Sequence, residues 1–96
     1  MDTFTLPLDL FADQNMSKLS LSAQNMLIRL YAYNFDCFTF TVKFKEPEYY
    51  GYTPGVQLHK KVIELLNLGF VTVVGNATQS QKRVFAFKHK VVIDHN

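Results

Sequence analysis

The stretch YTPGVQLHKKVIELLNLGFV, residues 52–71, decides the predicted fold because it marks both ends of a helix. Thr53 is a favourable N-cap, and Pro54 suits the first helical position, where its missing N–H is not needed. Gly69 stands where a helix commonly ends in the left-handed conformation. We therefore predict a helix that begins at Pro54, stops at Gly69 and turns directly into a strand.

This helix has one apolar face and one polar face on a 3.6-residue wheel. The apolar face, which we expect to be buried, contains Leu58, Val62, Leu65, Leu66 and Gly69. The opposite face, which we expect to contact a partner, contains Gln57, Lys60, Lys61, Glu64 and Asn67. His59 lies at the border of the apolar face, where a partly buried structural role is favoured over contact with a partner.

Two β-rich runs after this helix predict a hairpin. Residues 70–74 (FVTVV) and 83–88 (RVFAFK) flank the stretch GNATQSQ, residues 75–81, in which every residue is small or polar. We expect this stretch, with Gly75 at its start, to form the loop. Lys82 and Arg83 stand where the chain returns from it.

A first core helix is predicted upstream, from the apolar stripe of residues 23–34. Ser22 is the expected N-cap, with Ser20 as the alternative, and Asn34 is expected to end the helix. Phe38 to Lys45 then alternates strictly between apolar and polar residues, which is typical of a strand. A short second helix is expected in residues 46–51, with Pro47 at its first position and Gly51 in the following turn.

This order of elements resembles the winged helix-turn-helix family of DNA-binding proteins. The resemblance rests on the capped helix, on the tail formed by Leu65, Gly69, Phe70 and Val71, and on the polar hairpin loop. It implies an α+β fold, a winged helix-turn-helix with a three-stranded antiparallel sheet and a shortened second helix. The strand at residues 38–45 would pair with the hairpin.

The resemblance also implies a function, sequence-specific binding of double-stranded DNA, either in a transcriptional regulator or in a plasmid or phage replication module. The residues that would contact DNA are Thr53, Gln57, Lys60, Lys61, Glu64, Lys82 and Arg83. Glu64 would be tolerated only if it accepts a hydrogen bond from a cytosine amino group or points away from the phosphates.

The charge distribution agrees with a basic contact surface in the second half of the chain. Residues 51–93 contain six lysines and arginines and one glutamate, whereas the first fifty residues have a net charge of −2. The whole chain carries only +2. This modest charge and Glu64 favour the alternative, a small phage or plasmid-type adaptor or inhibitor that uses a winged helix for protein contact.

The composition argues against several other classes of protein. Cys37 is the single cysteine, so an intramolecular disulfide is excluded and a reducing, cytoplasmic location is expected. No apolar run approaches the roughly 20 residues of a membrane span. His59, His89 and His95 lack the spacing of a metal site, and no glycine-rich phosphate loop occurs. We expect no catalytic residues, metal or cofactor.

Residues outside the central domain, which we place at 19–90, form an N-terminal arm (1–18) and a C-terminal tail (91–96). Residues 6–11 (LPLDLF) alternate briefly around a proline, which favours an extended arm or a short edge strand. This arm either covers part of the core or joins a homodimer through Leu6, Leu8, Leu10 and Phe11. Residues 91–93 would extend the last strand or dock as a tail.

Overall fold

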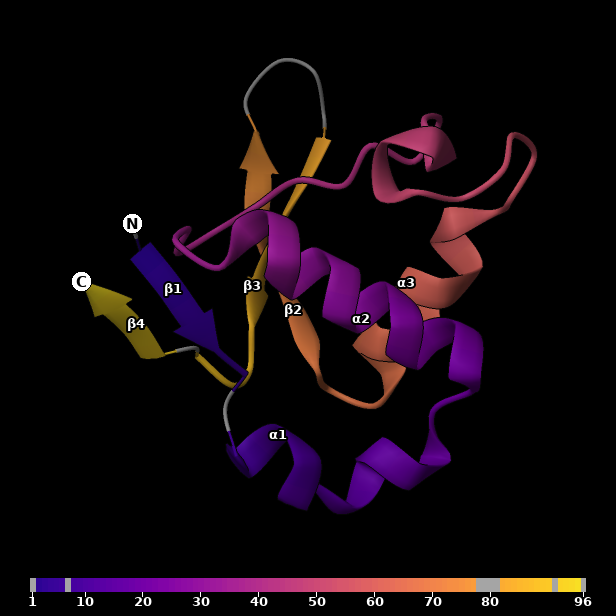
Figure 1. Ribbon diagram of the computed structural model, residues 1–96. Coiled ribbons are helices and arrows are strands. Elements are labelled where there is room, and N and C mark those ends of the chain that lie inside the picture. Colours follow the sequence, from indigo (N-terminus) through magenta and orange to yellow (C-terminus); the bar gives the residue numbers. More distant parts are fainter. Residues whose placement is uncertain (1, 7, 78–81, 91, 96) are drawn as a thin grey trace.

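The computed structural model describes residues 2–6, 8–77, 82–90 and 92–95 and has an α+β fold (Figure 1). Its helical elements are α1 (Leu8–Ala12), η1 (Gln14–Lys18), α2 (Leu21–Asn34), η2 (Pro47–Tyr50) and α3 (Leu58–Asn67). Its strands are β1 (Asp2–Thr5), β2 (Val71–Ala77), β3 (Lys82–Phe87) and β4 (Val92–His95). In the part of the chain that the structure describes, β2 pairs with β3 and β1 pairs with β4, both antiparallel.

Helix α2 begins after Ser20, the alternative N-cap, and not after Ser22. The Ser20 Oγ accepts a hydrogen bond from the Ala23 N–H at 3.2 Å, which satisfies one of the free donors of the first turn. Asn34 ends the helix as predicted, and its side-chain amide donates to the Leu30 carbonyl at 2.9 Å. The inward face of α2 is buried and consists of Ala23, Met26, Leu27, Leu30 and Tyr31.

Helix α3 starts later than predicted, because Thr53, Pro54 and Gly55 form a turn and not its first residues. Gly55 has a φ of 92°, and the Val56 N–H donates to the Thr53 carbonyl at 3.4 Å. Proline followed by a glycine of positive φ is typical of a type II turn, which interrupts helical geometry. The prediction of Thr53 as N-cap is therefore wrong, and Gln57 holds that position without a side-chain hydrogen bond.

The carboxyl end of α3 is confirmed. Gly69 has a φ of 82°, its N–H donates to the Leu66 carbonyl, and the Phe70 N–H donates to the Leu65 carbonyl at 2.9 Å. These two bonds form a Schellman motif, which leads the chain straight into β2. The predicted apolar face is confirmed as well, since Leu58, Val62 and Leu65 are fully buried.

The β2–β3 hairpin is longer than predicted. Strand β2 continues through Gly75 to Ala77, with a register shift between Val73 and Gly75, so the placement of Gly75 in the loop is wrong. A bulge of this kind admits an extra residue without ending the strand. Residues 78–81 of the predicted loop lie outside the described residues.

The predicted strand at residues 38–45 is wrong except at one residue. Phe40 forms an isolated antiparallel bridge with Phe85 of β3, with N···O distances of 2.9 and 2.8 Å. This bridge does not extend into a strand, because the chain turns at residues 42–46 and its backbone groups bond within that turn. The Phe44 N–H donates to the Val42 carbonyl, and the Lys43 N–H donates to the Tyr50 hydroxyl and not to a strand. A three-stranded sheet is thus not formed by the described residues.

The predicted apolar face of this segment is only partly buried. Phe40 and Val42 are buried and Phe44 packs against the core, whereas Thr41 and Lys43 are exposed. Phe38, the first apolar residue of the alternation, is 86% exposed. The short second helix appears as η2, with Pro47 in its first turn and Gly51 after it at a φ of 82°.

The N-terminal segment forms α1, and the two ends of the chain pair with each other. Residues 8–12 form α1, so the extended conformation predicted for residues 6–11 is wrong. One helical turn buries Leu10 while Phe11 stays 57% exposed. The arm therefore covers part of the core. Residues 92–95 form the separate strand β4, which pairs with β1 on the opposite side of Figure 1 from α3.

Candidate nucleic-acid interface

The exposed side of α3 begins with polar and basic side chains. Gln57, His59 and Lys60 are all exposed, which makes the prediction of a partly buried His59 wrong. His59 faces outward because the helix starts at Leu58, and Leu58 takes the inward position of the first turn. None of the salt bridges between described residues involves Lys60 or Lys61. The beginning of α3 therefore presents uncompensated positive charge.

Glu64, which we predicted on the same face, is directed away from it. Its carboxylate accepts hydrogen bonds from the Ser20 N–H at 2.5 Å and from the Ser20 hydroxyl at 3.1 Å. Ser20 is the N-cap of α2, where free N–H groups and the helix dipole both favour a negative charge. The Glu64 carboxylate thus binds the amino end of α2, an arrangement that depends on the packing of the two helices. The role of Glu64 in DNA contact stays a prediction.

Lys61 is half-buried, and its environment includes two residues that the sequence did not single out. The Lys61 Nζ lies 5.5 Å from the centroid of the Tyr52 ring, and the Arg29 Cζ lies 4.6 Å from the same centroid. These are cation–π distances. Lys61 is therefore held partly against the protein surface, unlike Lys60.

Arg29 connects α2 to the turn before α3. Its guanidinium donates to the Tyr50 carbonyl, and a Cβ built on Gly51 would lie 2.6 Å from the Arg29 Nη1. Position 51 therefore requires glycine for its positive φ, whereas a Cβ there would only displace the end of the flexible Arg29 side chain. The sequence offered one hint, since Arg29 is the single charged residue of α2.

The hairpin residues are only partly described. Arg83 is exposed on β3 and stands opposite Asn76 in the β2–β3 register. Lys82 begins β3, and its side chain lies outside the described residues. Thr53 is exposed in the turn before α3. In Figure 1 the end of β2, the start of β3 and the chain that leads into α3 all lie at the upper side of the molecule.

A second group of charged residues lies where the N-terminal segment meets the end of β3. The Asp13 carboxylate is 2.8 Å from the Lys88 Nζ and 3.0 Å from the His89 Nε2, and it accepts the Asn15 N–H at 2.9 Å. Hydrogen bonds from Lys88, then from His89 and Asn15, hold the pKa of Asp13 well below its usual value. Lys88 is thus paired and contributes little to a basic surface.

The carbonyl of His89 is also used, because it accepts a hydrogen bond from the Tyr31 hydroxyl at 2.5 Å. Burial raises the pKa of Tyr31, so this hydroxyl keeps its proton and remains a donor. Asn15 donates to the Leu68 carbonyl at 3.3 Å. Residues 13–15 are therefore held to the end of β3 and to the end of α3.

Comparisons of the chain with protein-family models, with curated proteins and with solved structures gave no match. Among the described residues, no group of three histidine, cysteine, aspartate or glutamate side chains is arranged to hold a metal ion. No helix in the described ranges has the length and apolar character needed to cross a membrane.

Proposed function

We propose that this protein binds double-stranded DNA through the exposed side of α3 and the β2–β3 hairpin. The observation that carries the proposal is the position of Glu64. Because its carboxylate binds Ser20, the exposed first turns of α3 present Gln57, His59 and Lys60 without a neighbouring negative charge. This is the condition under which Glu64 is compatible with a phosphate backbone next to the helix.

The order of the elements supports a winged helix-turn-helix fold for this function. Helix α2, the Phe40 bridge, η2, α3 and the β2–β3 hairpin follow one another in the order that the resemblance implies. The bridge joins Phe40 to β3, so the segment expected to form a third strand lies next to the hairpin. In this proposal α3 enters the major groove, while Lys82 and Arg83 contact phosphates.

The biological role within this proposal is that of a transcriptional regulator or of a plasmid or phage replication module acting in a reducing cytoplasm. One helix and one hairpin contact few base pairs, so we include binding as a two-fold dimer. Phe11 is 57% exposed and would take part in that contact, whereas Leu10 is buried in its own domain.

Titration of fluorescently labelled duplexes with the full chain at several salt concentrations tests the proposal. Replacing both Lys82 and Arg83 by alanine should weaken binding equally on all sequences and reduce the salt slope by about one for each lost phosphate contact. Lys18→Ala serves as the matched control, because Lys18 is an exposed lysine on η1. Wild-type protein that fails to bind at low salt, or variants that bind like wild type, would refute the proposal.

One observation favours protein contact as a second candidate function. Ile63 is 46% exposed and shares a helix face with Lys60 and Asn67. An exposed isoleucine at the centre of this face suits an apolar pocket on a protein partner better than a phosphate backbone. An Ile63→Ser variant that keeps DNA affinity but loses a copurifying protein would support this alternative.

A further inference from the structure

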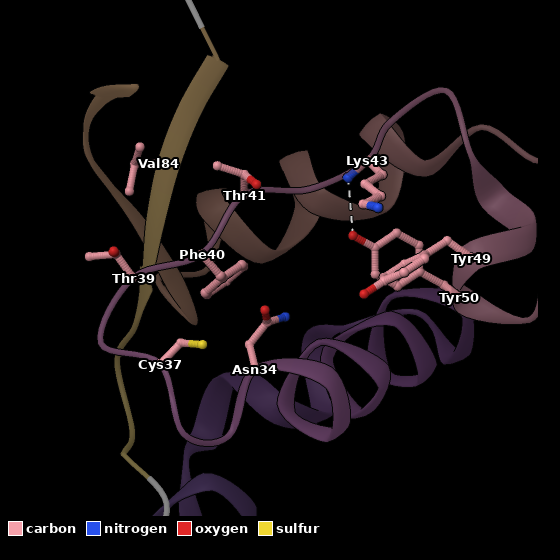
Figure 2. Close-up of a pocket in the computed structure, with 9 residues that line it drawn as sticks. All are labelled: Asn34, Cys37, Thr39, Phe40, Thr41, Lys43, Tyr49, Tyr50 and Val84. Atoms are coloured by element: carbon pink, nitrogen blue, oxygen red, sulfur yellow. Dashed lines mark hydrogen bonds between the residues drawn. The ribbon is translucent and has the colours of Figure 1, made fainter. Parts of the chain in front are cut away.

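A cavity of about 370 Å³ is lined by none of the residues that the proposed DNA contact uses, although Val84 in its wall directly follows Arg83 (Figure 2). Its walls come from the end of α2, residues 37–43, η2 and β3, and no lining residue belongs to α3 or β2. The volume is within the range of small-molecule sites, roughly 300 to 1,000 Å³.

Hydrogen-bond donors gather at one side of this cavity. The Lys43 ammonium lies 4.3 Å from the centroid of the Tyr49 ring, and it forms no salt bridge with any described residue. The Tyr50 hydroxyl accepts the Lys43 N–H at 3.0 Å, as the dashed line in Figure 2 shows, which leaves its own proton free to donate. Burial raises the pKa of Tyr50, so this proton is retained at neutral pH.

The lining carries no negative charge that would oppose an anion. Cys37 contributes a neutral thiol, because burial and then the neighbouring Asp36 raise its pKa. The carboxylates nearest in sequence to the lining belong to Asp36, which contacts the Cys37 Sγ at 3.5 Å, and to Glu48 within η2. The charge of Glu46, the N-cap of η2, acts on the Tyr50 hydroxyl and adds to burial in raising its pKa. None of these three carboxylates lines the cavity.

The opposite side of the cavity is suited to a flat apolar group. Phe40 is 5% exposed and its ring stacks on that of Phe87, with the two centroids 4.5 Å apart, so its orientation is held by packing. Val84 of β3 forms part of the same wall. Figure 2 shows Phe40 and Asn34 facing the same space below Thr41 and Lys43.

We propose that this cavity binds a small aromatic anion, with its planar ring against Phe40 and Val84 and its carboxylate or phosphate at Lys43 and the Tyr50 hydroxyl. A charge-assisted hydrogen bond from Lys43 would supply orientation as well as affinity. Aromatic carboxylates and nucleoside monophosphates both combine a planar ring with an anionic group. The experiment below determines which of the two classes binds.

The test is an NMR titration of the ¹⁵N-labelled full chain with benzoate and, separately, with adenosine monophosphate. We expect saturable shifts of the Thr41, Lys43 and Tyr50 amides with at least one of the two ligands. Benzyl alcohol and adenosine, which lack the anionic group, should bind about tenfold more weakly. Binding of adenosine monophosphate alone would assign a nucleotide, and binding of benzoate alone would assign a carboxylate.

Two lysine variants complete the test. Lys43→Met should weaken binding of the anion about tenfold, whereas Lys45→Met, an exposed lysine two residues away that does not line the cavity, should leave it unchanged. Should Lys43→Met fail to fold, Thr41→Val removes an exposed hydroxyl of the lining and should weaken binding about threefold. If neither benzoate nor adenosine monophosphate saturates the shifts by about 10 mM, or if wild type and Lys43→Met bind the anion equally well, the proposal is overturned.

Discussion

Two of the basic regions in the second half of the chain, the start of α3 and the residues just after β3, differ in whether a carboxylate neutralises their charge. Lys60 at the start of α3 is exposed and has no carboxylate partner among the described residues. Lys88 and His89, just after β3, both contact the Asp13 carboxylate. Both regions contribute to the same excess of positive charge in residues 51–93, yet only the first has that charge available for an incoming phosphate.

This difference shows that a count of basic residues does not locate a binding surface. Asp13 and Glu64 are acidic residues that each bind a partner inside the domain, but with opposite consequences. Asp13 removes positive charge from the end of β3, whereas Glu64 removes its own negative charge from the face of α3. The partners of the carboxylates therefore determine where the surface is basic.

The largest effect is expected on stability, from a cavity in the buried face of α3, the helix that carries the exposed Lys60. Leu65 is fully buried, so Leu65→Ala should lower the free energy of unfolding by about 2 to 5 kcal/mol. Ile63→Ala, on the exposed side of the same helix, should change it by no more than about 0.5 kcal/mol. Thermal melts of both variants measure the difference, and a lower melting temperature for Ile63→Ala would mean that the two faces of α3 are reversed.

A smaller effect is expected on specificity. If α3 lies in the major groove, Gln57→Ala should narrow the free-energy gap between target and random DNA by about 1 to 3 kcal/mol. Asp13→Asn, in the paired region, should leave that gap unchanged. Competition titrations with target and random duplexes measure this gap. If both variants narrow the gap equally, the start of α3 and the residues after β3 do not differ in DNA contact.

A weaker effect is expected from Glu64→Gln. The neutral amide keeps the shape but loses the charge at the amino end of α2, which should lower stability by about 0.3 to 1 kcal/mol. DNA affinity should change less than about twofold, because the carboxylate does not face the phosphates. Chemical denaturation and duplex titration give the two values. A large gain in DNA affinity would show instead that Glu64 repels the phosphates.

The smallest effect concerns pH. The pKa of Asp13 is lower in the folded state than its usual value of 3.8. The ion pairs of Asp13 therefore stabilise the folded state fully above pH 3.8, and this stabilisation is lost as the pH falls below 3.8 towards the lowered pKa. Wild type should melt above Asp13→Asn at pH 7, and this difference in melting temperature should narrow progressively as the pH falls below 3.8. A gap that stays constant to pH 2 would contradict the pairing of Asp13 with Lys88 and His89.

Local signals predicted the carboxyl end of α3 and its buried face well. Both features depend on residues only a few positions apart. A glycine just after a helix adopts the left-handed conformation that ends it, as Gly69 does. The 3.6-residue period places Leu58, Val62 and Leu65 on one face. The start of α3 was misplaced for an equally local reason. Pro54 is compatible both with the first turn of a helix and with a type II turn. Gly55, with its positive φ, favours the type II turn.

The candidate site, too, was only partly predictable from the sequence. The sequence indicated that Gln57 and Lys60 lie on a polar face, because that follows from helical spacing. It could not indicate that Glu64 turns to Ser20, which lies 44 residues away, or that Arg29 contacts the Tyr50 carbonyl. Contacts of this length depend on how α2 packs against α3, which no short pattern encodes.

By itself, the sequence of this protein determined where α2 and α3 end, which face of each of these two helices is apolar and that the fold is α+β. Only the tertiary structure decided that residues 38–45 form a single bridge to β3 and that β1 pairs with β4. It also decided which of the charged residues remain free. The physical reason is that helix ends and faces are set by hydrogen bonds and spacing within a few residues. Strand pairing and charge neutralisation instead need a partner from a distant part of the chain.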